Sequence, residues 1–262
     1  MPTASSPTPA DRLNVILMAE DVSASLWSEI DSGRIDELVP ELPALRMEQD
    51  PIHRHKDVLS HTVAVVAKTP ADLTVRLAAL FHDIAKPKTR SFDHGGVTFR
   101  HHEAVGARMT KKRMTSMGYD ESMTESVSEL VRMSGRFKGY GDGDGWSDSA
   151  VRRYAREAGP LLGRLNALIR SDCTTRNRAK AQALQDSIDD LERRIAELAD
   201  ADRRAAERPQ FDGERVMRLL GIEPCRQVGE IMRWLMEVKQ NEGDLPEAEL
   251  EARLRAYHAS LG

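Results

Sequence analysis

The chain of 262 residues carries 31% charged residues and a formal net charge of -4, which fits a water-soluble protein of one large or two small domains. This charge balance excludes a protein that coats nucleic acid with a uniformly basic surface, but it does not exclude local basic patches. The two cysteines, Cys173 and Cys225, are too few for a disulfide framework or a thiolate zinc site, which predicts a cytoplasmic protein. The sequence has no apolar run of about 18 residues, which predicts that it has no membrane span.

Helical periodicity dominates the chain, and the alternating β-branched runs that predict strands are nearly absent. The first ten residues are rich in Ser, Thr and Pro, which predicts a disordered leader. Residues 11–31 predict one or two short helices, and prolines punctuate the stretch that follows them. The predicted fold is therefore all-α, a bundle of helices.

The middle of the chain predicts a series of amphipathic helices joined by short polar segments. Lys86-Pro87 should end the second of these helices, because the residue before a proline avoids the helical region. A polar loop that contains Gly95-Gly96 follows it, and Gly118 closes the third helix in a left-handed conformation. The predicted helices span residues 57–68, 71–84, 99–117 and 121–133.

The second half of the chain begins with a Gly- and Asp-rich loop over residues 135–145. Within it, Asp142 and Asp144 predict a flexible acidic turn rather than a Mg²⁺ site, because no strand surrounds them. Ser147 predicts the N-cap of a helix that runs to Ala158.

A longer helical pattern covers residues 161–200, with a predicted break at 173–177. Beyond the break, Leu and Ile recur at spacings of four, three, four and three, which is typical of an antiparallel helical hairpin or short coiled coil. A last helical block covers residues 212–260, with Gly and Pro at its turns.

His82 and Asp83 are the sharpest candidates for chemistry, because they are adjacent at the end of an apolar helix. Adjacent helical residues diverge by about 100°, so one metal can bind both only when other helices add ligands. His61 and Asp172 are the candidates for those ligands. Imidazole and carboxylate suit Mn, Ni, Co, Fe or Zn better than Ca. A divalent transition metal held there would activate water for attack on phosphorus and neutralise a phosphate oxygen.

Four runs of this chain resemble the HD superfamily of metal-dependent phosphohydrolases: HKDVLSHTVAVV, LAALFHDIAKPKTR, FRHHEAVGARM and SDCTTRN. More narrowly, they resemble the HD domain in the C-terminal half of bacterial tRNA CCA-adding nucleotidyltransferases and poly(A) polymerases. The similarity extends over nearly the whole chain beyond the leader. It implies a disordered leader, neck-like helices, an HD domain and a helical tail, at residues 1–10, 11–50, 51–180 and 181–262.

The resemblance also implies roles for individual residues. Lys86 and His102 would bind the scissile phosphate and, with Asp83, form the catalytic group, while His101 is a bystander. The implied ligands of the metal are His61, His82, Asp83 and Asp172.

Three positions depart from the pattern of this family. Ser134 stands where a histidine is expected, and Lys138 where another is frequent. Their loss removes a group that a binuclear site would need, but it leaves the four ligands of a mononuclear site. Ala85 stands where glycine is usual, which is a mild change because alanine favours a helix.

The sequence leaves three functional interpretations open. The first is a metal-dependent phosphodiesterase or phosphatase that acts on a nucleotide, a 2′,3′-cyclic phosphate or an RNA 3′ end. The alternative is the tRNA-binding body and tail of a truncated or split tRNA nucleotidyltransferase, which would work with a separate nucleotidyltransferase chain. We find no Gly-Ser turn with strand-borne carboxylates, so nucleotide addition is not expected from this chain alone. The third is a protein-interaction scaffold with a degenerate site.

Local groups of basic residues bear on the RNA-binding interpretations. Each group has an ordinary explanation as a solvated helix surface, and taken together with the resemblance they predict a path for an RNA backbone. In addition to Lys86 and His102, the candidate RNA contacts are Arg136, Arg152, Arg153 and Arg176.

Overall fold

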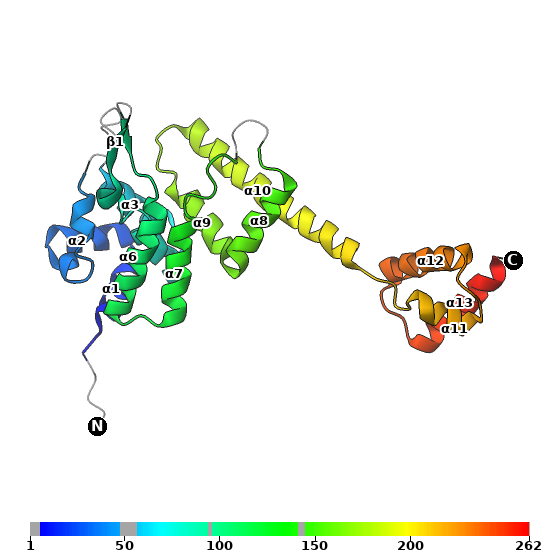
Figure 1. Cartoon of the computed structure of the whole chain (residues 1–262). Helices are drawn as coiled ribbons and strands as arrows, with labels where there is room; N and C mark the ends of the chain where they lie inside the picture. Colours follow the sequence, from blue (N-terminus) through cyan, green and yellow to red (C-terminus); the bar gives the residue numbers. More distant parts are fainter. Residues whose placement is uncertain (1–5, 48–56, 94–95, 141–144, 262) are drawn as a thin grey trace, which may run out of the picture. The chain divides into compact units, whose positions relative to one another are not determined.

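The structure is a computed structural model that describes residues 6–47, 57–93, 96–140 and 145–261. The chain divides into two compact units, Met1–Ala196 and Glu197–Gly262, and the division falls within the helix α10 (Arg178–Ala206). Helices dominate both units (Figure 1), which confirms the all-α fold. Among the described helices, none has the combined length and hydropathy that crossing a bilayer requires.

The first unit begins with two short helices, α1 (Pro9–Leu17) and α2 (Val22–Asp31), as predicted for residues 11–31. Helix α1 begins inside the segment predicted as a leader, because Thr8 and Asp11 form a reciprocal capping box and Pro9 favours the first turn. Two 3₁₀ turns follow, η1 (Arg34–Glu37) and η2 (Leu42–Leu45). The remainder of the leader, residues 1–5, lies outside the described residues.

The core of this unit is built around the helix α4 (Leu73–Phe81), in which every residue from Thr74 to Phe81 is buried. It packs against α3 (Val58–Lys68), α7 (Glu121–Met133) and α9 (Leu162–Asp172). Aspartates cap α3, α4 and α7 by accepting backbone N–H groups. These helices bring together segments that are distant in the sequence, and the candidate site lies where three of them end.

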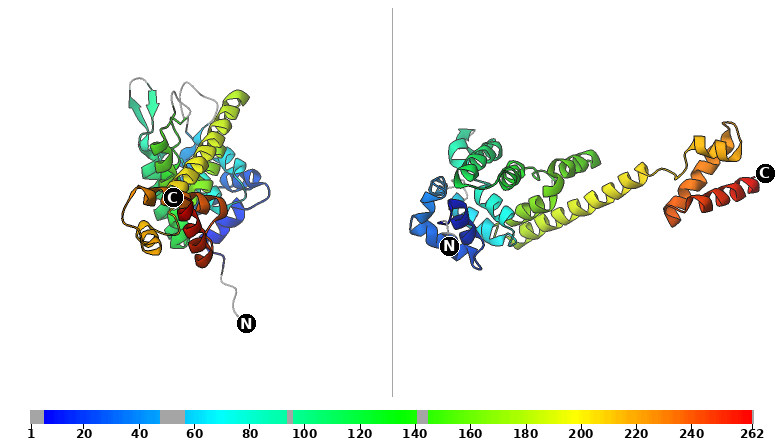
Figure 2. Two further views of the ribbon diagram at one scale, coloured as in Figure 1. Left: turned by 90° about the vertical axis from the view of Figure 1, so that its right-hand side faces the viewer. Right: turned by 90° about the horizontal axis from the view of Figure 1, so that it is seen from below.

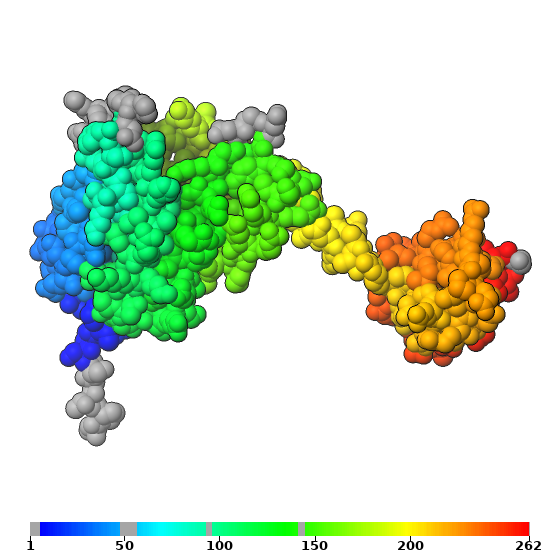
Figure 3. Space-filling view, in the orientation of Figure 1, coloured from blue at the N-terminus to red at the C-terminus, as the bar shows by residue number. Residues whose placement is uncertain are grey.

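Helix α6 (His102–Met117) lies beside α7 at the front of this unit (Figure 1), and both belong to a continuous surface in the space-filling view (Figure 3). Gly106 permits the close approach, because a Cβ atom there would lie 3.3 Å from Val131 Cγ1. Gly118 ends α6 with a left-handed φ of 90°, as predicted.

The segment after α4 differs from the prediction in two ways. Lys86-Pro87 does not terminate the preceding helix, since α4 already ends at Phe81 and Pro87 occupies the first turn of the short helix α5 (Lys86–Thr89). The predicted polar loop contains an antiparallel pair of strands, β1 (Ser91–Asp93) and β2 (Gly96–Thr98). Of the glycine pair in that loop, Gly95 lies outside the described residues.

The predicted break at 173–177 separates α9 from α10. These helices run antiparallel, because Asn166 bonds to Glu192 while Arg170, further along α9, bonds to the earlier Gln185. Helix α8 (Asp148–Ala158) begins at Ser147, which accepts the Ala150 N–H as the predicted N-cap, and η3 (Gly159–Leu161) joins it to α9. Asp142 and Asp144 of the predicted acidic turn lie outside the described residues.

The second unit contains α11 (Gly213–Leu220), α12 (Arg226–Glu242) and α13 (Glu247–Ser260) (Figure 2). These helices share an apolar core of their own, and the rings of Trp234 and Tyr257 stack beside it with centroids 4.5 Å apart. Gly221 and Gly243 end α11 and α12, as the predicted turns require. The fully or nearly fully buried side chains include Phe211, Val216, Ile231, Leu235, Leu250 and Leu254.

Candidate metal centre

Three helices bring the four predicted metal ligands together. His61 lies within α3, His82 and Asp83 directly follow α4, and Asp172 is the last residue of α9. His61 Nε2 lies 2.9 Å and His82 Nε2 lies 3.5 Å from Asp172 Oδ1. His82 Nε2 is also 3.2 Å from Asp83 Oδ2. One ligand atom from each of His61, His82 and Asp172 can therefore be chosen so that all lie within 4.8 Å of one another.

Backbone and hydroxyl groups orient the imidazole rings. His82 Nδ1 lies 2.7 Å from the carbonyl oxygen of Ala79, and because a carbonyl can only accept, Nδ1 is the donor. Nε2 of His82 then faces the cluster, where it is buried without a hydrogen-bond partner. His61 Nδ1 pairs with the hydroxyl of Thr174 at 2.9 Å, which likewise directs Nε2 inward. Such second contacts are characteristic of metal-binding histidines.

The charges in this cluster are strongly coupled. Burial opposes ionisation of Asp83, but the adjacent His82 and Lys86 outweigh it and hold the pKa of this carboxyl well below its usual range. Burial also acts on Asp172, where His61 and His82 hold the pKa well below its ordinary value. Although burial disfavours a charged imidazole, Asp83 and Asp172 raise the pKa of His82 to about 10. The site therefore attracts positive charge, whether a proton or a metal ion.

The donor set fits a divalent transition metal. Two imidazole nitrogens and two carboxylates converge from separate helices, and this mixture suits Mn, Fe, Co, Ni or Zn better than Ca. Nε2 of His82 supports this fit, because it is buried beside two carboxylate oxygens and yet forms no hydrogen bond with them. A metal ion would give that nitrogen a ligand bond in place of the missing hydrogen bond.

Lys86 and His102 lie beside this donor set, as the resemblance implies. Lys86 Nζ donates to Asp83 Oδ2 at 2.7 Å, and His102 Nε2 lies 3.6 Å from Asp83 Oδ1. His102 donates from Nδ1 to the carbonyl of Phe99 at 2.7 Å, which fixes its ring. The neighbouring His101 is exposed, in a left-handed conformation with a φ of 62°.

The ion pair between Glu103 and Lys138 completes the lining, with Glu103 Oε1 3.1 Å from Lys138 Nζ. Sequence reasoning missed the role of Glu103, although its place directly after His102 in FRHHEAVGARM was a usable signal. A cavity of about 300 Å³ opens over the cluster. Its lining comprises His61, His82, Asp83, Lys86, His102, Glu103, Ser134, Gly135, Lys138 and Asp172.

The candidate RNA contacts gather only in part. Arg136 and Arg153 line a second cavity, of about 240 Å³, together with Trp146, and Lys138 borders both this cavity and the one over the metal centre. Arg136 is paired with Glu157 at 2.8 Å. Arg152 is half-buried on α8, and Arg176 lies exposed between α9 and α10, so neither joins these cavity walls.

Comparison with known proteins places these residues in a family. The model of the HD domain family matches residues 58–205. The chain is 29% identical over 242 residues to the A-adding tRNA nucleotidyltransferase of Deinococcus radiodurans, covering 87% of this chain and 53% of that protein. It is 31% identical over 215 residues to the CC-adding tRNA nucleotidyltransferase of Thermus thermophilus, covering 79% of this chain and 46% of that protein. The chain thus spans about half the length of the curated relatives it matches.

Proposed function

This chain belongs to the HD domain family, and from that premise we propose that it is a metal-dependent phosphohydrolase acting on a nucleotide or an RNA end. The observation that carries the proposal is the convergence of two histidines and two aspartates around the buried Nε2 of His82, which forms no hydrogen bond. A buried charge cluster is weak evidence for a role in stability, because apolar side chains in its place are often neutral or stabilising. The position of this cluster next to an open cavity favours a chemical role.

His61, His82, Asp83 and Asp172 would hold one divalent transition metal. When bound, the metal supplies a Lewis acid that lowers the pKa of water and offsets negative charge on a phosphate. Ser134 supports a mononuclear site, because it stands where the family pattern has a histidine and so offers no imidazole to a second metal. Its hydroxyl instead donates to the Val131 carbonyl at 2.9 Å.

Lys86 and His102 would act on the phosphate. The Lys86 ammonium lines the cavity beside Asp83, where it is suited to bind a phosphate oxygen by a charge-assisted hydrogen bond. His102 has Nδ1 fixed by a carbonyl and Nε2 facing the cavity, so it is able to hold or release a proton at Nε2 for the leaving oxygen. The pair of Glu103 and Lys138 would orient the substrate at the rim.

The test is hydrolysis by protein loaded with Mn²⁺, Co²⁺ or Ni²⁺, with bis(p-nitrophenyl) phosphate and a panel of nucleotides as substrates. We expect His82→Ala and Asp83→Ala to reduce turnover to the level of metal-free protein. His101→Ala is the matched control, because His101 is an exposed neighbour in sequence of the proposed group and should leave turnover unchanged. Equal rates for wild type and His82→Ala across the panel would refute the proposal.

A second candidate function is favoured by the relatives, whose names state that they act on tRNA. In this role the chain would hold tRNA through neck-like helices at 11–50, an HD domain at 51–180 and a tail at 181–262, while a nucleotidyltransferase adds nucleotides. The cavity with Arg136, Arg153 and Trp146 supports a phosphate and base contact there.

Gel-shift titration with tRNA over a salt series tests this candidate. Affinity should fall steeply with salt, and Arg153→Glu should weaken binding. Arg153→Lys, which keeps the positive charge at the same position, serves as the control and should weaken binding much less. Absence of a shift at low salt would eliminate the candidate.

A further inference from the structure

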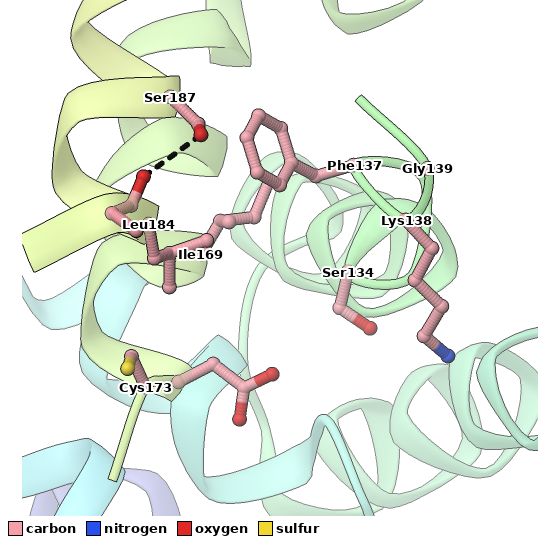
Figure 4. Close-up of a pocket in the computed structure, with 10 residues that line it drawn as sticks. Ser134, Phe137, Lys138, Gly139, Ile169, Cys173, Leu184 and Ser187 are labelled. Carbon is pink, nitrogen blue, oxygen red and sulfur yellow. Dashed lines mark hydrogen bonds between the residues drawn. The ribbon is translucent and has the colours of Figure 1, made fainter. Parts of the chain in front are cut away.

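A larger cavity of about 560 Å³ adjoins the metal centre (Figure 4). It lies in the first unit, between the segment that follows α7, the end of α9 and the start of α10. Ser134, Lys138 and Asp172 line both this cavity and the one over the metal centre, so the two spaces lie side by side at those residues. None of the proposed chemistry accounts for this space.

The two ends of this cavity differ in chemical character. Figure 4 shows the side chains of Phe137, Ile169 and Leu184 gathered at one end, away from the Lys138 ammonium. The ring of Phe137 is held by stacking on Tyr140, with centroids 5.4 Å apart and an interplanar angle of 29°. The charged members of the lining, Lys138 and Asp172, belong to the end shared with the metal centre. The far end therefore suits a neutral, flat, largely apolar group.

The polar atoms at the walls offer acceptors. The hydroxyl of Ser134 donates to the Val131 carbonyl at 2.9 Å, and that of Ser187 donates to the Ala183 carbonyl at 2.8 Å. Because each hydroxyl proton is already used, each oxygen offers a ligand only an acceptor. Ser134 lies at the end shared with the metal centre, whereas Ser187 lines the larger cavity alone. An N–H group on a heterocycle complements the Ser187 oxygen, and a second phosphate does not.

We propose that this cavity binds the nucleoside of the substrate, so that the substrate is a nucleoside phosphate, either free or at an RNA 3′ end. This inference rests on the proposed function, which places the phosphate at the metal centre. A volume of about 560 Å³ lies within the range of about 300–1,000 Å³ that is usual for small-ligand sites. The phosphate at the charged end and the base at the apolar end then match the polarity of the two adjacent spaces.

The decisive variant is Ala183→Trp, since Ala183 lines the cavity from an exposed position on α10 and an indole there would fill the space without emptying the core. Ser187→Phe fills the same cavity from one turn later and provides a second variant. Ala179→Trp is the matched control, being an exposed alanine on the same helix outside the lining. Circular dichroism and the midpoint of thermal unfolding verify that each variant folds.

Paired substrates isolate the contribution of the base, because ribose 5-phosphate is a nucleoside 5′-monophosphate without its base. We expect Ala183→Trp to raise KM for nucleoside monophosphates by about tenfold or more while leaving kcat/KM for ribose 5-phosphate unchanged. A lower KM for a 3′-phosphorylated RNA oligomer than for a nucleoside 3′-monophosphate would identify the RNA end as the source of the nucleoside; the reverse order would identify the free nucleotide.

Two outcomes separate this inference from the proposed function. If the wild-type protein hydrolyses ribose 5-phosphate as efficiently as nucleoside monophosphates, or Ala183→Trp behaves like Ala179→Trp, the nucleoside site is refuted while the phosphohydrolase stands. If no phosphate ester is hydrolysed, but calorimetry shows nucleoside monophosphates binding to wild type and Ala179→Trp and not to Ala183→Trp, the phosphohydrolase is refuted while the nucleoside site stands.

Discussion

Replacing Asp83 by asparagine isolates the electrostatic coupling at the metal centre in metal-free protein. The side chains of Asp83 and Lys86 are 2% and 8% exposed, and their charged atoms lie 2.7 Å apart. Asn keeps the size of the side chain but removes its charge, so Lys86 stays buried without its partner. Breaking a buried ion pair in this way costs about 3–5 kcal/mol. We expect Asp83→Asn to lower the free energy of unfolding by about 3 kcal/mol, the lower end of that range, because the cavity admits water to Lys86.

Glu103→Gln is the matched control, with the same change of acid to amide at the edge of the same cavity. Its partner Lys138 is 74% exposed, so the loss of this ion pair should cost no more than about 1 kcal/mol. A double variant, Asp83→Asn with Lys86→Met, should recover a large part of the stability, because it removes the unpaired charge as well.

Urea unfolding in the presence of a chelator measures these differences. Trp27 and Trp146 lie in the first unit and Trp234 lies in the second, so a Trp234→Phe background makes tryptophan fluorescence report on the first unit alone. This separation matters because two units need not unfold together. If Asp83→Asn costs no more than Glu103→Gln, or if adding Lys86→Met brings no recovery, the electrostatic account of the centre is wrong.

Further predictions concern metal binding, packing and pH. Ni²⁺ or Mn²⁺ at about 100 times its dissociation constant should raise the free energy of unfolding of the first unit by about 2.7 kcal/mol, and His61→Ala should abolish the effect; an equal gain in that variant would refute the ligand set. Gly106→Leu should destabilise by about 1–3 kcal/mol in urea unfolding, because side-chain atoms would be forced against Val131, and a stable variant would contradict the close approach of α6 and α7. Burial opposes the charge of Asp72, but Arg164 and the N-terminus of α4 lower its pKa below the usual value. The contribution of the Asp72 carboxylate to the free energy of unfolding is therefore present above its unfolded pKa and is lost as pH falls through its folded pKa. Asp72→Ala should lower the free energy of unfolding by about 1 kcal/mol near neutral pH and by almost nothing at about pH 2. The same loss at both pH values would refute this assignment.

The elements that the sequence predicts well are those that local signals determine. The N-cap at Ser147 and the left-handed Gly118 depend on one or two residues each, and apolar spacing places the helices between them. The strands β1 and β2 escape prediction because three residues are too few for an alternating pattern, and Phe92 at their centre is 72% exposed rather than buried. The end of α4 at Phe81 also escapes prediction from the local sequence. His82 and Asp83 follow it and contact residues of α3 and α9, which are distant in the sequence.

The sequence indicates which residues the structure brings together at the candidate site, but not what surrounds them. Spacing alone does not bring His61 of α3 next to Asp172 of α9; their places on other helices made them candidates, and the resemblance to a family implied that both are ligands. The ion pair of Glu103 with Lys138 joins α6 to the segment after α7, which no periodicity or motif of either segment indicates. Contacts of this kind depend on the packing of α6 against α7, and so on Gly106, rather than on local sequence.

The departures from the family pattern acquire a physical meaning when the two cavities are considered together. Ser134 and Lys138 are the positions where the resemblance implies histidines, and both lie at the junction of the metal centre with the larger cavity. The Ser134 side chain is shorter than an imidazole and is bonded to its own helix. Lys138 is turned to Glu103, which keeps its charge at the rim. The two proposals, a centre with one metal and a nucleoside site beside it, therefore both depend on the small or charged side chains at these two positions, because an imidazole at either position would stand between the centre and the apolar end beside Phe137.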